Sequence, residues 1–115
     1  MNYQYVPGYI GLKITNTPSW SKCISIMRKY KDASIAEIKT TIEAGQYILY
    51  YETTDTNGIR KIKKCYDELQ KNGISVELYE RDELMTRQIL CNLITSHRIT
   101  KREVESEIYT ETIDD

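Results

Sequence analysis

The sequence predicts an α+β protein: a two-layer βααβαβ domain with a three-stranded sheet, followed by one or two C-terminal helices. Two observations carry this prediction. The apolar residues switch along the chain between a period of two, typical of strands, and a period near 3.6, typical of helices. Short segments rich in Gly, Asn, Asp and Ser separate these stretches, as turns do.

The first strand and the first helix follow directly from these patterns. In the strand, Ile10, Leu12 and Ile14 alternate with less apolar residues, as in a strand that is buried on one side. A Thr-Pro pair ends it. Either Ser19 or Ser21 is placed to cap the following helix. Its apolar residues share one face: Trp20, Ile24 and Met27.

For the second helix, the sequence predicts the beginning, the apolar face and the end. Ser34 and Glu37 have the spacing of a capping box, in which each side chain satisfies a backbone donor of the other residue. Gly45 supplies a left-handed stop. The apolar residues at helical spacing are Ile35, Ile38 and Ile42.

A second strand, a third helix and a third strand follow. The continuous apolar and aromatic run Tyr47–Tyr51 predicts a covered strand. Asp55–Gly58 is a turn that also begins a helix, which Asn72-Gly73 ends. The apolar side of that helix comprises Ile59, Ile62, Tyr66 and Leu69. The alternating residues of the last strand are Ile74, Val76 and Leu78.

Two further helices are expected in the remainder of the chain. Asp82 is predicted to cap the first, and Thr100 with Glu103 forms a second capping box. The apolar residues of the first of these helices fall at four-residue spacing: Met85, Ile89 and Leu93. The chain is therefore interpreted as one domain, with a βααβαβ core at residues 9–80 and a helical extension at residues 82–110.

The composition is that of an ordinary globular protein. The chain has 115 residues, of which 29% are charged and 40% hydrophobic, enough for one well-formed core. No secretory signal or membrane-spanning run is visible, so we expect a cytoplasmic protein without a membrane partner. The odd and widely spaced cysteines disfavour a disulfide framework or a structural zinc site, and they are predicted to be buried: Cys23, Cys65 and Cys91.

No catalytic or metal-binding motif is recognisable, so the expectation is a protein that is not an enzyme and has no cofactor. His97 is the only histidine, and no patterned partner accompanies it, as a general base would require. Asp55 could begin a calcium loop, but the twelfth position of such a loop needs a glutamate and is Tyr66 here.

Charge is distributed unevenly. Through Ser75 there are eleven basic and seven acidic residues, whereas from Val76 onward there are five basic and ten acidic ones. An acidic, tyrosine-bearing surface suits the capture of a basic protein, with the tyrosines as anchors. The residues predicted to bind the partner are Glu77, Tyr79, Glu80, Asp82, Glu83, Glu103, Glu107 and Tyr109. The leading hypothesis is a non-enzymatic inhibitor, most specifically an immunity protein that neutralises a bacterial nuclease-type toxin.

The run Arg60–Lys64 supports an alternative, a nucleic-acid-binding protein that touches phosphates through Arg60, Lys61 and Lys64. No base-stacking motif accompanies this run. The charge balance of the whole chain is slightly acidic, at −1. A solvated helix face is therefore the favoured interpretation of these residues, and nucleic acid is a disfavoured partner.

Two segments carry a resemblance to a known family. Ile35–Glu43 has the pattern apolar-x-Glu-apolar-Lys-x-x-apolar-Glu, and Leu69–Leu78 joins a helix end, the Asn72-Gly73 stop and a strand. With these segments, residues 14–78 resemble the C-terminal domain of the bacterial ribosomal stalk protein, in its second helix, third helix and last strand. The resemblance implies the βααβαβ fold and a second alternative function, a stalk-like or adaptor module that binds translation factors or a Clp ATPase. In the first helix only Ile24 and Arg28 match the family, whereas the positions of its factor-contacting lysines include Trp20, Ser21 and Ser25 here.

Overall fold

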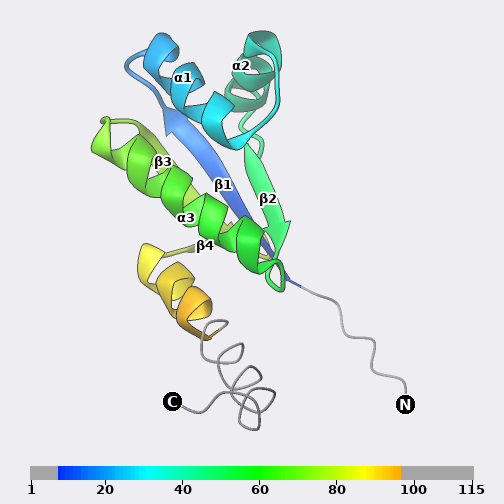
Figure 1. Ribbon diagram of the computed structural model, residues 1–115. Coiled ribbons are helices and arrows are strands. Elements are labelled where there is room, and N and C mark those ends of the chain that lie inside the picture. The colour runs from blue at the N-terminus through cyan, green and yellow to red at the C-terminus, as the bar shows by residue number, and fades with distance from the viewer. Residues whose placement is uncertain (1–7, 97–115) are drawn as a thin grey trace, which may run out of the picture.

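The computed structural model describes residues 8–96 and confirms the α+β class. The strands are β1 (Tyr9–Asn16), β2 (Leu49–Glu52), β3 (Ser75–Glu80) and β4 (Glu83–Met85). The helices are α1 (Trp20–Tyr30), α2 (Ile35–Glu43), α3 (Thr56–Lys71) and a fourth helix over residues 87–96. The strands form one antiparallel sheet in the order β2-β1-β3-β4 (Figure 1).

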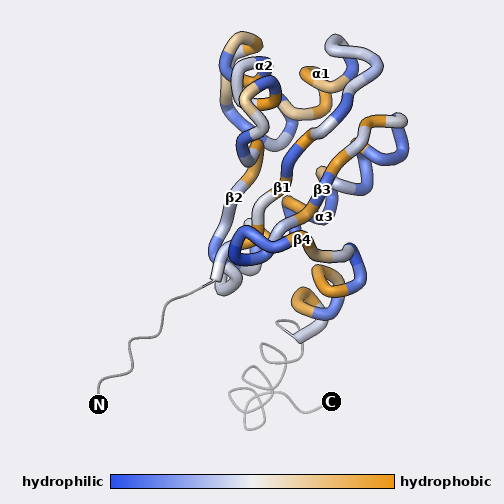
Figure 2. The backbone as a smooth tube through the Cα atoms, turned by 180° about the vertical axis from the view of Figure 1, so that it is seen from behind, coloured by the Kyte–Doolittle hydropathy of each residue, from blue (hydrophilic) through white to orange (hydrophobic). Residues whose placement is uncertain are grey.

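The helices cover one face of this sheet. α3 packs against β1, β2 and β3, α1 packs against α3, and α2 packs against α1 and β1. In Figure 1, α3 lies in front of the strands. Figure 2 views the molecule from the other side, where the strands lie in front of α3. The domain therefore has two layers, and the second face of the sheet carries no helix in the described part of the chain.

The core lies between the sheet and the helices, where the apolar patterns predicted it. Ile10, Leu12 and Ile14 of β1 are buried, as are Ile59 and Ile62 of α3. Burying an aliphatic side chain of this size contributes roughly 1.5–3 kcal/mol, so this alternation is a main source of stability. The predicted burial of cysteines holds for two of the three, since Cys91 is only half-buried.

The helix caps predicted for α1 and α2 are present. Ser19 caps α1 by accepting from the Lys22 amide at 3.3 Å. In the capping box of α2, Ser34 Oγ accepts from the Glu37 amide at 3.1 Å and donates to the Glu37 carboxylate at 3.2 Å. After α2 the chain turns at Gly45, whose φ of 67° lies in the left-handed region.

Two predictions at the second strand and second helix need correction. β2 begins at Leu49, two residues later than predicted, and it is covered on one side only. Tyr50, in its middle, is 46% exposed. Ile35, predicted to face the core, is the first residue of α2 and is 49% exposed, whereas Ile38, one turn later, is buried.

The three-strand prediction missed β4. Asp82 does not cap a helix: with Arg81 it forms the turn of a β3–β4 hairpin, at φ values of 64° and 51°. Met85 belongs to β4 and is buried beside Leu78. Thr86 caps the fourth helix instead, because its hydroxyl accepts from the Ile89 amide at 3.3 Å. A strand of three residues is too short for periodicity to separate it from a helical turn.

The predicted capping box at Thr100 and Glu103 lies outside the described residues. Among the helices within residues 8–96, none combines the length and the apolar character needed to cross a membrane.

A bidentate ion pair between Arg87 and Asp67 attaches the fourth helix to α3. Arg87 donates through Nε to Asp67 Oδ1 at 2.7 Å and through Nη2 to Oδ2 at 3.0 Å. Lys63 Nζ lies 3.2 Å from the same carboxylate. The Arg87 guanidinium, together with Lys63, lowers the pKa of Asp67 below its usual value.

The substitution Asp67→Asn should lower the thermal midpoint at pH 7 by about 2 °C, since exposed ion pairs contribute roughly 0.2–1 kcal/mol. A lowered native pKa stabilises the fold above the unfolded pKa of about 3.8, and this contribution is lost as the pH falls through the native value. The thermal midpoints of the unmodified protein and of the Asp67→Asn variant should therefore become equal in acid. The control Glu43→Gln alters an exposed α2 carboxylate without an ion pair in the described part, and it should leave the midpoint unchanged. A difference that persists at pH 2 contradicts this account.

Candidate functional site

The uncovered side of the sheet carries a continuous set of polar and aromatic residues. In a strand, successive side chains point to opposite faces, so the residues that alternate with the buried Ile10, Leu12 and Ile14 of β1 lie on this side. The pairing register aligns them across the sheet. We call this surface the open face; its residues are Tyr9, Gly11, Lys13, Tyr47, Tyr50, Glu52, Glu77, Tyr79, Asp82 and Leu84.

Four tyrosines form a single ring cluster on the open face. The rings of Tyr9 and Tyr50 stack with centroids 4.8 Å apart, and those of Tyr50 and Tyr47 stack at 4.9 Å. Tyr79 meets Tyr47 edge-on at 5.8 Å. These separations lie in the favourable range for aromatic pairs, which contribute about 0.5–1.5 kcal/mol beyond the area they bury. The cluster therefore links β1, β2 and β3 across the exposed side of the sheet.

Gly11 makes this arrangement possible. A Cβ at this position would lie 2.3 Å from Cδ1 of Tyr47, closer than any real contact. The missing side chain lets the Tyr47 ring lie directly on the backbone of the central strand. Tyr47 precedes β2, so this contact places a loop residue in the middle of the open face.

Lys13 lies between two of the rings. Its Nζ is 4.9 Å from the centroid of Tyr47 and 4.8 Å from that of Tyr79. Both distances are within cation–π range. The ammonium group is thus held over the aromatic cluster and makes no ion pair with a carboxylate among residues 8–96.

Carboxylates accept hydrogen bonds from three of the tyrosine hydroxyls. The Tyr47 hydroxyl donates to Asp82 at 2.5 Å, and the Tyr79 hydroxyl donates to Glu77 at 2.7 Å. The third pair is Tyr9 with Glu52, at 3.2 Å.

These contacts keep the phenols protonated. Burial, followed by the hydrogen bond to Asp82, raises the pKa of Tyr47. For Tyr79 the hydrogen bond to Glu77 is the main cause of a raised pKa, and for Tyr9 it is the one to Glu52. The arrangement leaves the carboxylates as the outward charges, while the phenols hold them in fixed positions.

The two layers of the domain carry opposite charge. The strands contain one lysine and four glutamates. Helices α1, α2 and α3 contain nine basic residues and four acidic ones. Two of these glutamates, Glu52 and Glu77, lie on the open face together with Asp82 and one lysine, so the open face is acidic, and the helix layer is basic.

The structure divides the residues that the sequence predicted to bind a partner. Glu77, Tyr79 and Asp82 come together on the open face. Glu80 and Glu83 pair with each other beside the hairpin turn, and the register puts them on the same face of the sheet as Leu78 and Met85. The remaining predicted residues lie outside the described part of the chain: Glu103, Glu107 and Tyr109.

Sequence reasoning missed Tyr9, Lys13, Tyr47 and Tyr50 as parts of this surface. The sequence did contain a signal for Tyr9 and Lys13. They alternate along β1 with the buried isoleucines, so they point to the opposite face of the sheet. Tyr47 and Tyr50 gave no such signal, because a continuous apolar run hides which face each residue takes.

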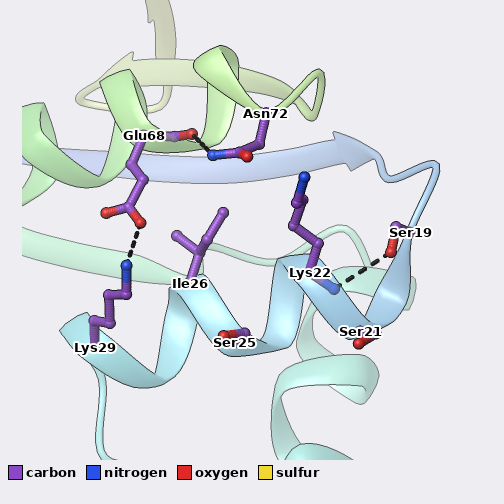
Figure 3. Close-up of a pocket in the computed structure, with 8 residues that line it drawn as sticks. All are labelled: Ser19, Ser21, Lys22, Ser25, Ile26, Lys29, Glu68 and Asn72. Atoms are coloured by element: carbon purple, nitrogen blue, oxygen red, sulfur yellow. Dashed lines mark hydrogen bonds and ion pairs between the residues drawn. The ribbon is translucent and has the colours of Figure 1, made fainter.

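The hollows of the molecule are shallow. One of about 480 Å³ lies between α1 and α3 (Figure 3), and several of its polar groups are used within the protein. Lys29 is 2.5 Å from the Glu68 carboxylate, and the Asn72 amide donates to the Glu68 carbonyl at 2.8 Å. Within residues 8–96 there is no group of three His, Cys, Asp or Glu side chains placed to hold a metal.

A second surface lies between α1 and α2. This groove, of about 610 Å³, is lined by Ser21, Ile24, Ser25, Arg28 and Ile35. It brings the exposed Ile35 beside the two first-helix residues that the stalk-protein resemblance singled out. No interaction of Arg28 with another side chain occurs in the described part.

Comparison of the chain with known protein families, with curated proteins and with solved structures finds no match. The site is therefore interpreted from its own geometry.

The substitution Gly11→Ala should destabilise the domain by about 1–3 kcal/mol, the usual effect of overpacking, because the new methyl group collides with the Tyr47 ring. Denaturant unfolding measures the loss, and near-ultraviolet circular dichroism reports the displaced tyrosines. In a Tyr47→Ala background the same glycine substitution should have little effect. Equal losses in both backgrounds contradict the proposed contact.

Proposed function

We propose that this chain is a non-enzymatic protein-binding inhibitor that captures a basic partner on the open face of its sheet. The observation that carries the proposal is the tyrosine cluster bordered by Glu52, Glu77 and Asp82. Tyrosines supply large contact areas with little loss of conformational freedom, and they are enriched among the residues that dominate binding energy. Three of the four hydroxyls already have partners, so the surface is largely preformed and loses little entropy on binding.

The charge of the open face favours a basic protein over a nucleic acid. Three carboxylates and one lysine face outward there, so phosphates would be repelled. The stacking surfaces that bases need are partly occupied, since Tyr9, Tyr47 and Tyr50 stack on one another. A protein with exposed Lys and Arg side chains matches both the sign and the acceptor chemistry of this surface.

The most specific form of the proposal is an immunity protein that neutralises a bacterial nuclease-type toxin. Nucleases that act on phosphate backbones present basic surfaces, which an acidic and rigid face can mask. Electrostatic steering would also speed association, as a protective inhibitor requires.

The test is association of the chain with a basic nuclease toxin domain from the same source. The double variant Glu77→Gln/Asp82→Asn removes two charges while its amide oxygens still accept from the tyrosine hydroxyls. Its association rate at low salt should fall about tenfold, and the difference should shrink in high salt. Surface plasmon resonance measures both rates.

The matched control is Asp32→Asn/Glu43→Gln, which removes two exposed charges away from the open face. Its association rate should stay within about twofold of the unmodified protein, because exposed charges that are distant from the contact are largely screened by salt. Equal slowing of the two double variants argues against the open face. Absence of any complex with basic nuclease domains, and of any inhibition, argues against the inhibitor function.

The α1–α2 groove supports a second candidate, a stalk-like or adaptor module that binds translation factors or a Clp ATPase. It combines apolar side chains, Ile24 and Ile35, with the cation of Arg28. An arginine beside a small apolar groove is a common anchor for a protein partner.

Under this second candidate, Arg28→Glu should weaken co-purification with ribosomes, translation factors or a Clp ATPase by about tenfold, as loss of an anchor residue does. Lys22→Glu makes the same charge change on the same helix outside the groove and serves as the control. Quantitative pulldown measures the retained partner. Retention that is equal for the two variants counts against a role for this groove.

A further inference from the structure

A basic cavity, distinct from the α1–α3 hollow and the α1–α2 groove, lies on the helix layer. It has a volume of about 370 Å³ and is lined by Tyr30, Asn57, Arg60, Lys61 and Lys64. Tyr30 is the last residue of α1, and the other four lie within residues 57–64 of α3. Three cations and no carboxylate line this cavity, so it differs in sign from the open face.

The cations that line this cavity have no carboxylate partner in the described residues, whereas neighbouring cations form ion pairs. Lys29 pairs with Glu68, and Lys63 and Arg87 pair with Asp67. Within residues 8–96, by contrast, Arg60, Lys61 and Lys64 pair with no carboxylate; the one contact of Lys61 is with the Tyr51 ring, 5.6 Å away. Like charges at positions i and i+4 of a helix destabilise it, and Arg60 and Lys64 have this spacing. An anion in the cavity would remove that repulsion.

Arg60 also carries a donor without an acceptor. Its Nε is shielded from solvent and makes no hydrogen bond in the described part of the chain. A buried polar group left in this state costs about 1–3 kcal/mol, and most such groups in folded proteins are satisfied. The same residue lines the cavity, so a bound anion could satisfy this donor through a rearrangement of the Arg60 side chain.

The donor set selects the chemistry of the ligand. A guanidinium matches two oxygens of an oxyanion at once, and two lysines add point charges. Asn57 contributes an amide, whose side chain has no partner in the described residues. Four groups around one cavity suit a tetrahedral anion with several acceptor oxygens better than a carboxylate with two. We propose that this basic cavity binds a phosphate group.

A neighbouring depression gives room for the rest of a phosphate ester. It has a volume of about 360 Å³ and shares Tyr30 and Lys61 with the basic cavity. It extends past Lys31 and along β2, where Tyr51 lines it. A phosphate held by Arg60 and Lys64 could therefore carry its organic part into an aromatic groove. The basic cavity itself shares no residue with the open face, whereas the neighbouring depression is also lined by Tyr47 and Tyr50 of that face. Phosphate binding in the cavity does not rest on the function proposed for the open face.

The test uses the full chain in ¹⁵N-edited NMR titrations. Sodium phosphate should shift the amides of residues 57–64 saturably, whereas sodium chloride at equal ionic strength should not. Arg60→Gln and Lys64→Gln should each raise the dissociation constant about tenfold, the effect of losing a hydrogen bond to a charged group. Lys71→Gln, near the other end of the same helix, should leave it unchanged. Circular dichroism establishes that the variants are folded.

Two further ligands identify the source of the phosphate. Adenosine 5′-monophosphate that binds more tightly than phosphate, with shifts extending to Tyr51, supports a free phosphate ester. A single-stranded oligonucleotide that binds more tightly still, with an affinity that falls steeply with salt, supports a nucleic-acid strand. The proposal is overturned if phosphate gives no saturable shift at residues 57–64, if chloride reproduces the shift, or if Lys71→Gln weakens binding as much as Arg60→Gln.

Discussion

The central strand β1 is the constraint on which the rest of the structure depends. It pairs with β2 on one side and with β3 on the other, so it fixes the register of both. Its alternate residues face two different environments: Ile10, Leu12 and Ile14 face the helices, whereas Tyr9 and Lys13 belong to the open face. A shift of one residue in its pairing would exchange these sets and bury a lysine in the core.

The contact of Gly11 with Tyr47 connects this strand to the rest of the open face. The Tyr47 ring lies on the backbone of β1, and its hydroxyl reaches Asp82 in the β3–β4 turn. That turn holds two non-glycine residues at positive φ, a conformation that costs roughly 1–2 kcal/mol for an ordinary residue. The hydrogen bond from the Arg81 amide to the Tyr9 carbonyl, at 3.0 Å, and the bond to Tyr47 offset this strain. The hairpin is thereby held against the tyrosine cluster.

The separation of charge between the layers explains why one small domain offers two binding surfaces of opposite sign. Acidic residues gather on the sheet, where tyrosine hydroxyls orient them. Basic residues gather on the helices, where carboxylates of α3 neutralise some and leave the cluster around Arg60 unpaired. Each surface repels the ligand of the other, so the two proposed activities do not compete for one site.

The sequence by itself determined the element order from β1 to β3, the helix caps at Ser34 and Asp55, and most of the core, because these follow from local periodicity and from hydrogen bonds within a few residues. Only the tertiary structure decided which residues share the open face. β4 is too short for its residues to show a period, and the Tyr47–Tyr51 run is apolar throughout. In neither segment does the local sequence indicate which residues face the core and which face outward. Glu77 and Glu80 are three residues apart, yet the pleat of β3 separates them onto opposite faces, while Tyr47 and Asp82 meet across 35 positions of the chain.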